Sequence, residues 1–117
     1  MRLFRRRKKS LNMEHFTERW KALQLHCASR KTWPDAIIEA DDLLDEALKK
    51  CRFKGKTTGE RLVAAQHTLT SNDTVWYGHK LCKTITSEDV RKLKKKDVID
   101  ALAGFRQALR DLGALPS

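Results

Sequence analysis

The stretch 78–88 combines residue types that reactive sites use. It contains one histidine, one cysteine and three small hydroxyl side chains, and it follows the aromatic pair at positions 76 and 77. A reactive Cys82 would need a base and a positively charged, partly exposed setting. His79 lies one helical turn away, and Lys80 and Lys83 supply positive charge. The same spacing arises by chance in helices, so the alternative is that Cys82 is a small apolar helix residue.

The histidines and cysteines also raise the question of a metal site. His79 and Cys82 are three residues apart, and His26 and Cys27 lie elsewhere in the chain. Structural zinc sites normally use two pairs of closely spaced ligands on turns. Cys27 and Cys51 instead fall on the apolar stripes of two expected helices, where cysteine behaves as a small buried residue. We therefore expect no metal site and no cofactor.

Apolar residues recur at helical spacing along most of the chain. Ser10 or Asn12 can cap the first helix, and Thr57 with Glu60 forms a capping box before a short third one. Irregular chain is expected at 84–93. The expected helices lie at about residues 13–28, 33–52, 57–67, 74–83 and 95–112.

These stripes can be buried only against one another. The 117 residues include only two prolines and five glycines, so few positions interrupt regular structure. The expected fold class is all-α, a four- to five-helix antiparallel bundle formed by residues 11–117 as a single domain. The outer surface of the second helix is expected to be negative, with acids at Asp35, Glu39, Asp41, Asp42, Asp45 and Glu46.

Charge is unevenly distributed along the chain. The formal net charge is +10, and residues 1–10 carry six Lys or Arg and no acid. Such a flexible basic arm can bind phosphate backbones or anionic lipid, or can be a solvated chain end. No apolar run reaches the ~20 residues of a transmembrane helix, and no apolar core follows the charged start as in a signal peptide. Three unclustered cysteines favour the reducing cytoplasm.

Five segments of the chain carry a family resemblance: Pro34 to Asp45, Phe53 to Leu62, Val75-Trp76, His79-Lys80-Leu81 and Gln107 to Leu115. Over roughly residues 14–115, the chain resembles small bacterial proteins with a HEPN-like helical domain. The superfamily implies a four-helix bundle, often dimeric, and many of its members are metal-independent ribonucleases. Their motif is an arginine, usually followed by a polar residue, with a histidine four to six residues later at a dimer cleft. That histidine can act as general base and the arginine can stabilise the phosphorane.

The motif is degenerate in this chain. The resemblance implies arginine at position 82, asparagine at 83 and histidine at 87, but the chain has Cys82, Lys83 and Ser87, and retains only Glu88. Lysine lacks the bidentate fork of arginine, and serine does not take a proton unaided near neutral pH. No catalytic residue is carried over from the family, and the degenerate motif consists of His79, Cys82, Lys83 and Ser87.

Two other matches to the motif spacing occur, Arg61 to His67 and Arg19 to His26. Both lie inside expected helices rather than at a helix end. Positions six apart in a helix are separated by about 120° around its axis. These matches show how unspecific the spacing is by itself.

Positive residues around the degenerate motif predict a binding surface. Trp76 or Tyr77 can stack a base there, although the alternative for Trp76 is a place in the core. We expect a non-catalytic HEPN-like module that binds RNA or a protein partner through residues 78–96. The alternatives are a helical dimerisation or adaptor module and a metal-independent ribonuclease with an atypical site at His79 and Lys83. The expected nucleic-acid contacts are Arg5, Arg6, Arg7, Lys8, Lys9, Lys80, Lys83, Arg91, Lys92, Lys94 and Lys95.

Overall fold

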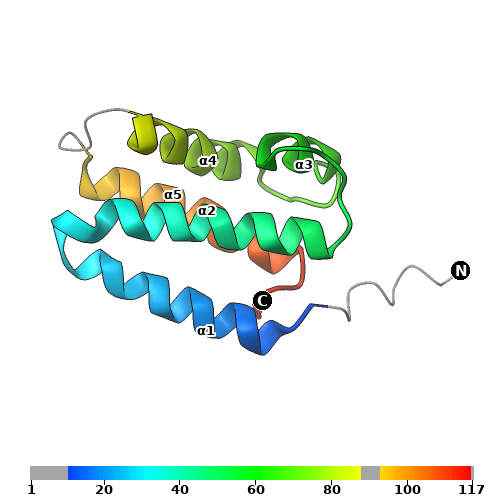
Figure 1. Ribbon diagram of the computed structural model, residues 1–117, viewed down its shortest axis with the longest axis horizontal. Coiled ribbons are helices and arrows are strands. Elements are labelled where there is room, and N and C mark those ends of the chain that lie inside the picture. Colours follow the sequence, from blue (N-terminus) through cyan, green and yellow to red (C-terminus); the bar gives the residue numbers. More distant parts are fainter. Residues whose placement is uncertain (1–10, 88–92, 117) are drawn as a thin grey trace, which may run out of the picture.

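The fold is an all-α antiparallel bundle, as the apolar stripes predict (Figure 1). The computed structural model describes residues 11–87 and 93–116, and these contain five α-helices and no strand. The elements are α1 (Met13–Gln24), the 3-10 turns η2 (Leu25–Ala28) and η3 (Arg30–Thr32), α2 (Trp33–Lys50), α3 (Thr58–Ala64), α4 (Asn72–Ser87) and α5 (Lys95–Asp111).

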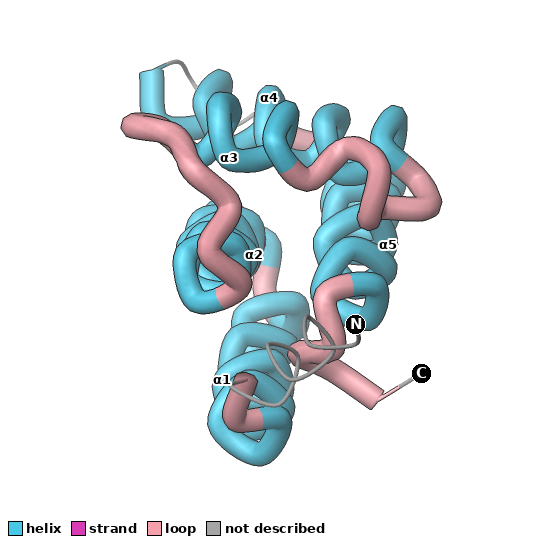
Figure 2. Tube along the Cα trace, turned by 90° about the vertical axis from the view of Figure 1, so that its right-hand side faces the viewer, coloured by secondary structure: helices cyan, strands magenta, loops and turns pink. Residues whose placement is uncertain are grey.

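The helices are arranged in three tiers, as an end-on view shows (Figure 2). α2 and α5 form the middle tier, α1 lies on one side of them, and α4 with the short α3 lies on the other. α4 packs most extensively on α5, and α2 touches every other α-helix. Fully buried side chains from all the tiers meet in one core, for example Phe16, Leu44, Leu62, Val75 and Phe105.

The end of α1 differs from the expected helix, which ran to about residue 28. The chain tightens into η2 after Gln24, and the carbonyl oxygens there accept hydrogen bonds from η3 and α2. Thr32 Oγ1 donates to the oxygen of His26 at 2.6 Å, and Trp33 Nε1 donates to that of Cys27 at 3.0 Å. A 3-10 turn has three residues per turn, so it rotates Cys27 away from the apolar stripe. Cys27 is exposed, and its predicted burial is wrong.

The expected irregular chain at 84–93 is also partly wrong, because α4 continues to Ser87. Ile85 is buried one turn after the buried Cys82, so the apolar stripe of α4 extends beyond its predicted end. The stripe was hard to recognise in the sequence because its middle positions are Gly78 and His79, which are both buried. Tertiary packing outweighs the weak helix propensity of Thr84, Ile85 and Thr86.

Glycines allow α4 and α5 to cross closely. A Cβ added at Gly104 would overlap the carbonyl oxygen of Thr74, and one at Gly78 would lie 2.9 Å from the Phe105 ring. The contact at Gly104 is with backbone, which cannot rotate aside as a side chain can. The crossing therefore requires glycine at position 104.

We expect Gly104→Ala to destabilise the fold by about 1–3 kcal/mol, since α4 must move outward to accept the methyl group. Thermal and urea unfolding followed by circular dichroism measure this loss. Gly59→Ala is the matched control, because a Cβ there meets its nearest neighbour, Trp76, at 3.6 Å, which is ordinary contact. That control should be neutral or slightly stabilising. Equal stability of the two variants would contradict the close crossing.

Candidate nucleic-acid interface

A buried His–Asp pair joins α4 to α2. His79 Nδ1 lies 2.8 Å from Asp41 Oδ1, and both residues are buried. With the proton on Nδ1, the ring donates to the carboxylate and leaves the lone pair of Nε2 facing outward. Asp41 therefore has a partner inside the fold, and its predicted place on the solvated acidic face of α2 is wrong.

The burial of Asp41 could be recognised from its position in the sequence. Asp41 lies four residues after Ile37 and three before Leu44, and both of these are fully buried. Positions three and four apart share a helix face, so Asp41 had to lie on the apolar stripe. A carboxylate on that stripe requires a hydrogen-bond partner, and His79 was a candidate for it.

His79 opens onto a groove between α4 and the start of α3. Trp76, His79, Lys80 and Lys83 line it from α4, and residues 57–59 line it from the other side. The groove volume is about 580 Å³. Among the described residues, His79 Nε2 has no hydrogen-bond partner, although Nδ1 is held by Asp41. One ring nitrogen is thus fixed by the fold, and the other is available to a ligand.

The ring of Trp76 lies beside His79 in this groove. The ring centroids are 5.8 Å apart and the planes meet at 77°, an edge-to-face arrangement. Across from them, a Cβ at Gly59 would lie 3.6 Å from Trp76 and 3.8 Å from His79 Nε2. Glycine at this position keeps the opening in front of the imidazole wide.

A second, partly buried ion pair holds the α3 wall of the groove in place. Arg61 donates from Nε and Nη2 to the two carboxylate oxygens of Asp45 at 2.8 and 3.1 Å, and from Nη1 to the carbonyl oxygen of Gly55 at 2.5 Å. Burial raises the pKa of Asp45, but hydrogen bonds from Arg61, Thr58 and Lys49 outweigh it, so this pKa lies below its ordinary value. The pair thereby fixes α3 and the loop before it onto α2.

The start of α3 has only half of the predicted capping box, because the Glu60 side chain bonds to the N–H of Lys56 and not to that of the N-cap residue Thr57. Glu60 N–H donates to Thr57 Oγ1 at 3.1 Å, and Glu60 Oε1 accepts from the N–H of Lys56 at 2.8 Å. Both hydrogen bonds stabilise the first turn of this short helix. Thr57, Thr58 and Gly59 therefore form an ordered wall, which belongs to the site although the sequence does not predict it.

Cys82 does not have the properties of a nucleophile. It is buried, and burial followed by the negative charges of Asp41 and Asp42 raises the pKa of its thiol to about 12. A nucleophilic cysteine needs the opposite, a lowered pKa beside positive charge. Cys82 is the apolar helix residue of the alternative interpretation.

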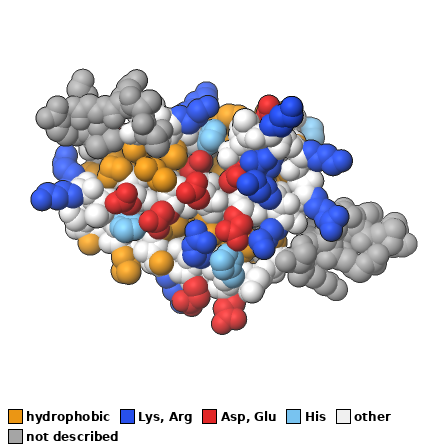
Figure 3. All heavy atoms as spheres, in the orientation of Figure 1, with side chains coloured by type: hydrophobic (Ala, Val, Ile, Leu, Met, Phe, Trp, Pro, Cys, Tyr) orange, Lys and Arg blue, Asp and Glu red, His pale blue; other side chains and the backbone are white. Residues whose placement is uncertain are grey.

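The expected basic contacts are only partly brought together. Lys80 and Lys83 line the groove, and Lys80 also lines an adjoining hollow with Asp73, Trp76 and Tyr77. Lys94 and Lys95 are exposed at the start of α5 but do not line the groove. The face drawn in Figure 3 has acidic side chains along its middle. Outside the described residues lie Arg5, Arg6, Arg7, Lys8, Lys9, Arg91, Lys92 and the side chain of Ser87.

The two chance motif matches do not form Arg–His sites. Arg61 is occupied by Asp45 and Gly55, and His67 is exposed. Arg19 Nη1 lies 3.6 Å from Glu46 Oε1, and His26 Nε2 lies 3.0 Å from Glu39 Oε2. Arg61, Arg19 and His26 are thus each paired with an acid, and Arg61 is also paired with a carbonyl group.

The part of the chain that the structure describes contains no group of three or more His, Cys, Asp or Glu placed to hold a metal ion. Within the same residues, no helix combines the length and apolar character that crossing a membrane requires. Comparison of the chain with protein-family models, curated proteins and solved structures gives no significant match.

Proposed function

We propose that this chain is a HEPN-like module that binds single-stranded RNA in the α3–α4 groove without cleaving it. The observation that carries the proposal is the lining of one groove by Trp76, His79, Lys80 and Lys83. Single-stranded nucleic acid is bound by aromatic rings that stack bases and by cations that follow the phosphates. The groove brings both kinds of group together.

Each side chain has a distinct part in this proposal. Trp76 stacks a base, and Lys80 and Lys83 contact phosphates on either side of it. His79 offers Nε2 to the base or to a ribose hydroxyl, in an orientation fixed by Asp41. The basic arm and Lys94 and Lys95 add contacts that depend on charge rather than sequence.

We propose binding without cleavage because the residues at positions 82, 83 and 87 do not match the catalytic motif. The HEPN resemblance implies an arginine and a histidine where this chain has Cys82 and Ser87, and the Cys82 thiol is buried with a pKa of about 12. Neither residue can replace the base or the bidentate cation of the motif. A cytoplasmic location and a homodimer, both implied earlier, remain part of the proposal.

A second candidate function is a metal-independent ribonuclease that uses His79. The observation that favours it is the open Nε2 of His79, whose other ring nitrogen, Nδ1, is held by the buried Asp41. A neutral imidazole held this way can act as general base on a ribose 2′-hydroxyl. Lys80 or Lys83 would then stabilise the negative charge of the transition state.

One experiment distinguishes these functions. Purified protein is incubated with a fluorescent single-stranded RNA in excess chelator, and binding and cleavage are followed together. We expect binding with intact RNA, and His79→Gln should weaken binding by about tenfold or less because one hydrogen bond is lost. His67→Gln, which changes an exposed histidine, should leave binding unchanged.

The remaining outcomes contradict the proposal in different ways. Cleavage that His79→Gln abolishes and His67→Gln retains would establish the ribonuclease. No binding to RNA at low salt would favour the dimerisation or adaptor module. Binding that disappears on deletion of residues 1–9 but tolerates changes in the groove would assign the RNA to the arm.

A further inference from the structure

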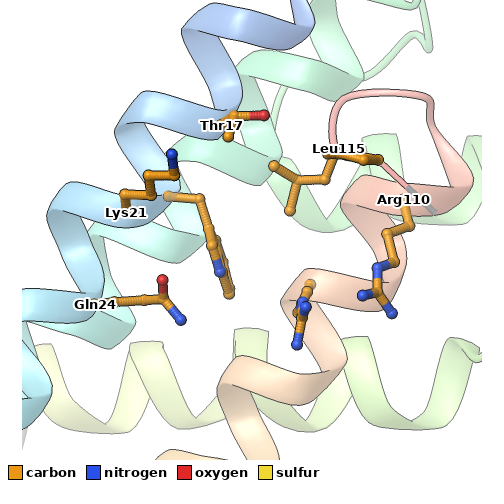
Figure 4. A pocket seen from close by; sticks show the side chains of 8 residues that line it. Thr17, Lys21, Gln24, Arg110 and Leu115 are labelled. Atoms are coloured by element: carbon orange, nitrogen blue, oxygen red, sulfur yellow. The ribbon is translucent and has the colours of Figure 1, made fainter.

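A second hollow lies between α1, α5 and the C-terminal segment, away from the α3–α4 groove (Figure 4). Its volume is about 380 Å³. Gly113 ends α5 with φ +82°, and the N–H groups of Ala114 and Leu115 both donate to the carbonyl oxygen of Leu109. This turn folds the segment back, so that Leu115 points between the two helices (Figure 4).

The charged side chains that line this hollow are all positive. Lys21 comes from α1, and Arg106 and Arg110 come from α5, while none of the described lining residues is acidic. No described carboxylate lies within ion-pair distance of these three cations. Three cations that line one hollow without a described counter-charge favour an anion of more than one negative charge.

Two of the lining residues also carry buried donors without acceptors. Trp20 Nε1 and Arg110 Nε are buried and have no hydrogen-bond partner, and Trp20 as a whole is only 6% exposed. Buried N–H groups are almost always paired, because an unpaired one costs free energy. A bound oxygen anion would supply the missing acceptor. Gln24 and Arg110 reach toward the hollow from opposite helices (Figure 4), and Gln24 adds an amide donor.

The rest of the lining is apolar. The indole of Trp20 and the side chains of Leu115 and Pro116 provide surface for an uncharged organic group. A phosphate monoester has two negative charges near neutral pH, three acceptor oxygens and such an organic group. We propose that this hollow binds a small phosphate ester, with the phosphate at Arg106, Arg110 and Trp20 Nε1 and the organic group against Leu115. The site is independent of the RNA-binding proposal.

The three tryptophans make the test specific. Each indole N–H gives its own NMR signal: Trp20 lines this hollow, Trp76 lines the α3–α4 groove, and Trp33 already donates to the oxygen of Cys27. The folded full-length chain is titrated with phenyl phosphate, and we expect a saturable shift of the Trp20 signal while that of Trp33 stays fixed. Substitution of Trp20 by phenylalanine assigns the signal.

Variants and alternative ligands complete the test. Arg110→Gln should weaken binding of phenyl phosphate at least about tenfold, the expected effect of losing charged hydrogen bonds. Lys50→Gln is the matched control, since it removes one positive charge from an exposed site outside the hollow. If Arg110→Gln does not fold, Arg106→Gln at an exposed position replaces it.

Three results would overturn the proposal. A Trp20 signal that does not move at millimolar phenyl phosphate would exclude the site. Binding of benzoate as tight as that of phenyl phosphate would exclude the preference for phosphate, and equal binding of inorganic phosphate would exclude the apolar contact. RNA binding is read separately at Trp76, so the failure of one proposal does not resemble the failure of the other.

Discussion

Replacing Arg61 by methionine is expected to lower the free energy of unfolding by about 2–4 kcal/mol, somewhat below the ~3–5 kcal/mol usual for a fully buried ion pair because Asp45 is partly exposed. Arg61 is 9% exposed and donates to both oxygens of Asp45 and to Gly55. Methionine fills a similar volume but removes the donor to the Gly55 carbonyl oxygen and leaves the Asp45 carboxylate with only Thr58 and Lys49 as donors. Urea unfolding at neutral pH measures the loss.

Two further variants test whether the loss of stability comes from breaking the ion pair or only from removing one charge. Arg61→Met combined with Asp45→Leu should recover most of the stability, because the double variant contains no unpaired buried charge. Arg19→Met removes a guanidinium that pairs with Glu46 at a more exposed site and should cost about 1 kcal/mol or less. A loss of that small size for Arg61→Met would show that the Asp45 pair is not important for stability.

The Arg61–Asp45 pair should also affect how the stability of the fold depends on pH. The pKa of Asp45 is lowered in the folded state from its ordinary value of 3.8, so the folded chain binds this proton less readily than the unfolded chain does. The stabilisation from Asp45 is therefore complete above the ordinary pKa and is lost as the pH falls through the lower, folded value. In the Arg61→Met variant the main donor to Asp45 is absent, so the loss of stability as the pH falls should be smaller than in the original chain.

The sequence was sufficient for the fold because each long helix has a clear apolar stripe. Stripes such as Val98, Leu102, Phe105 and Leu109 in α5 repeat at spacings of three and four, and no other element type buries that pattern. The errors occurred where a stripe contains residues that are not apolar. Gly78 and His79 interrupt the apolar pattern in the middle of α4, and Asp41 places an acid on a buried face of α2.

The candidate site could be predicted only in its local part. His79, Lys80 and Lys83 share one stretch of α4, so their proximity follows from helix geometry. Asp41 is 38 residues earlier in the chain, and the wall at residues 57–59 lies on another helix. Those contacts depend on how α2, α3 and α4 pack. Stripes specify which faces are buried but not which polar residues meet across them.

Replacing Trp76 by leucine is expected to weaken RNA binding about ten- to a hundredfold, since stacking of one base contributes about 1–3 kcal/mol. Leucine keeps apolar contact with the core but has no flat face for a base. Trp76→Phe retains such a face and should recover much of the affinity. Fluorescence anisotropy with a labelled single strand, repeated at several salt concentrations, measures both variants.

The salt dependence distinguishes stacking from charge in the same groove. Trp76→Leu removes no cation, so its affinity should be lower at every salt concentration with an unchanged slope of log affinity against log salt. Lys80→Gln removes one phosphate contact and should reduce that slope by about 0.7. A Trp76→Leu variant that binds like the original chain, together with a slope that Lys80→Gln leaves unchanged, would place the RNA outside the groove. Because stacking and charge neutralisation differ in their response to salt, these two substitutions test whether one RNA segment contacts both side chains.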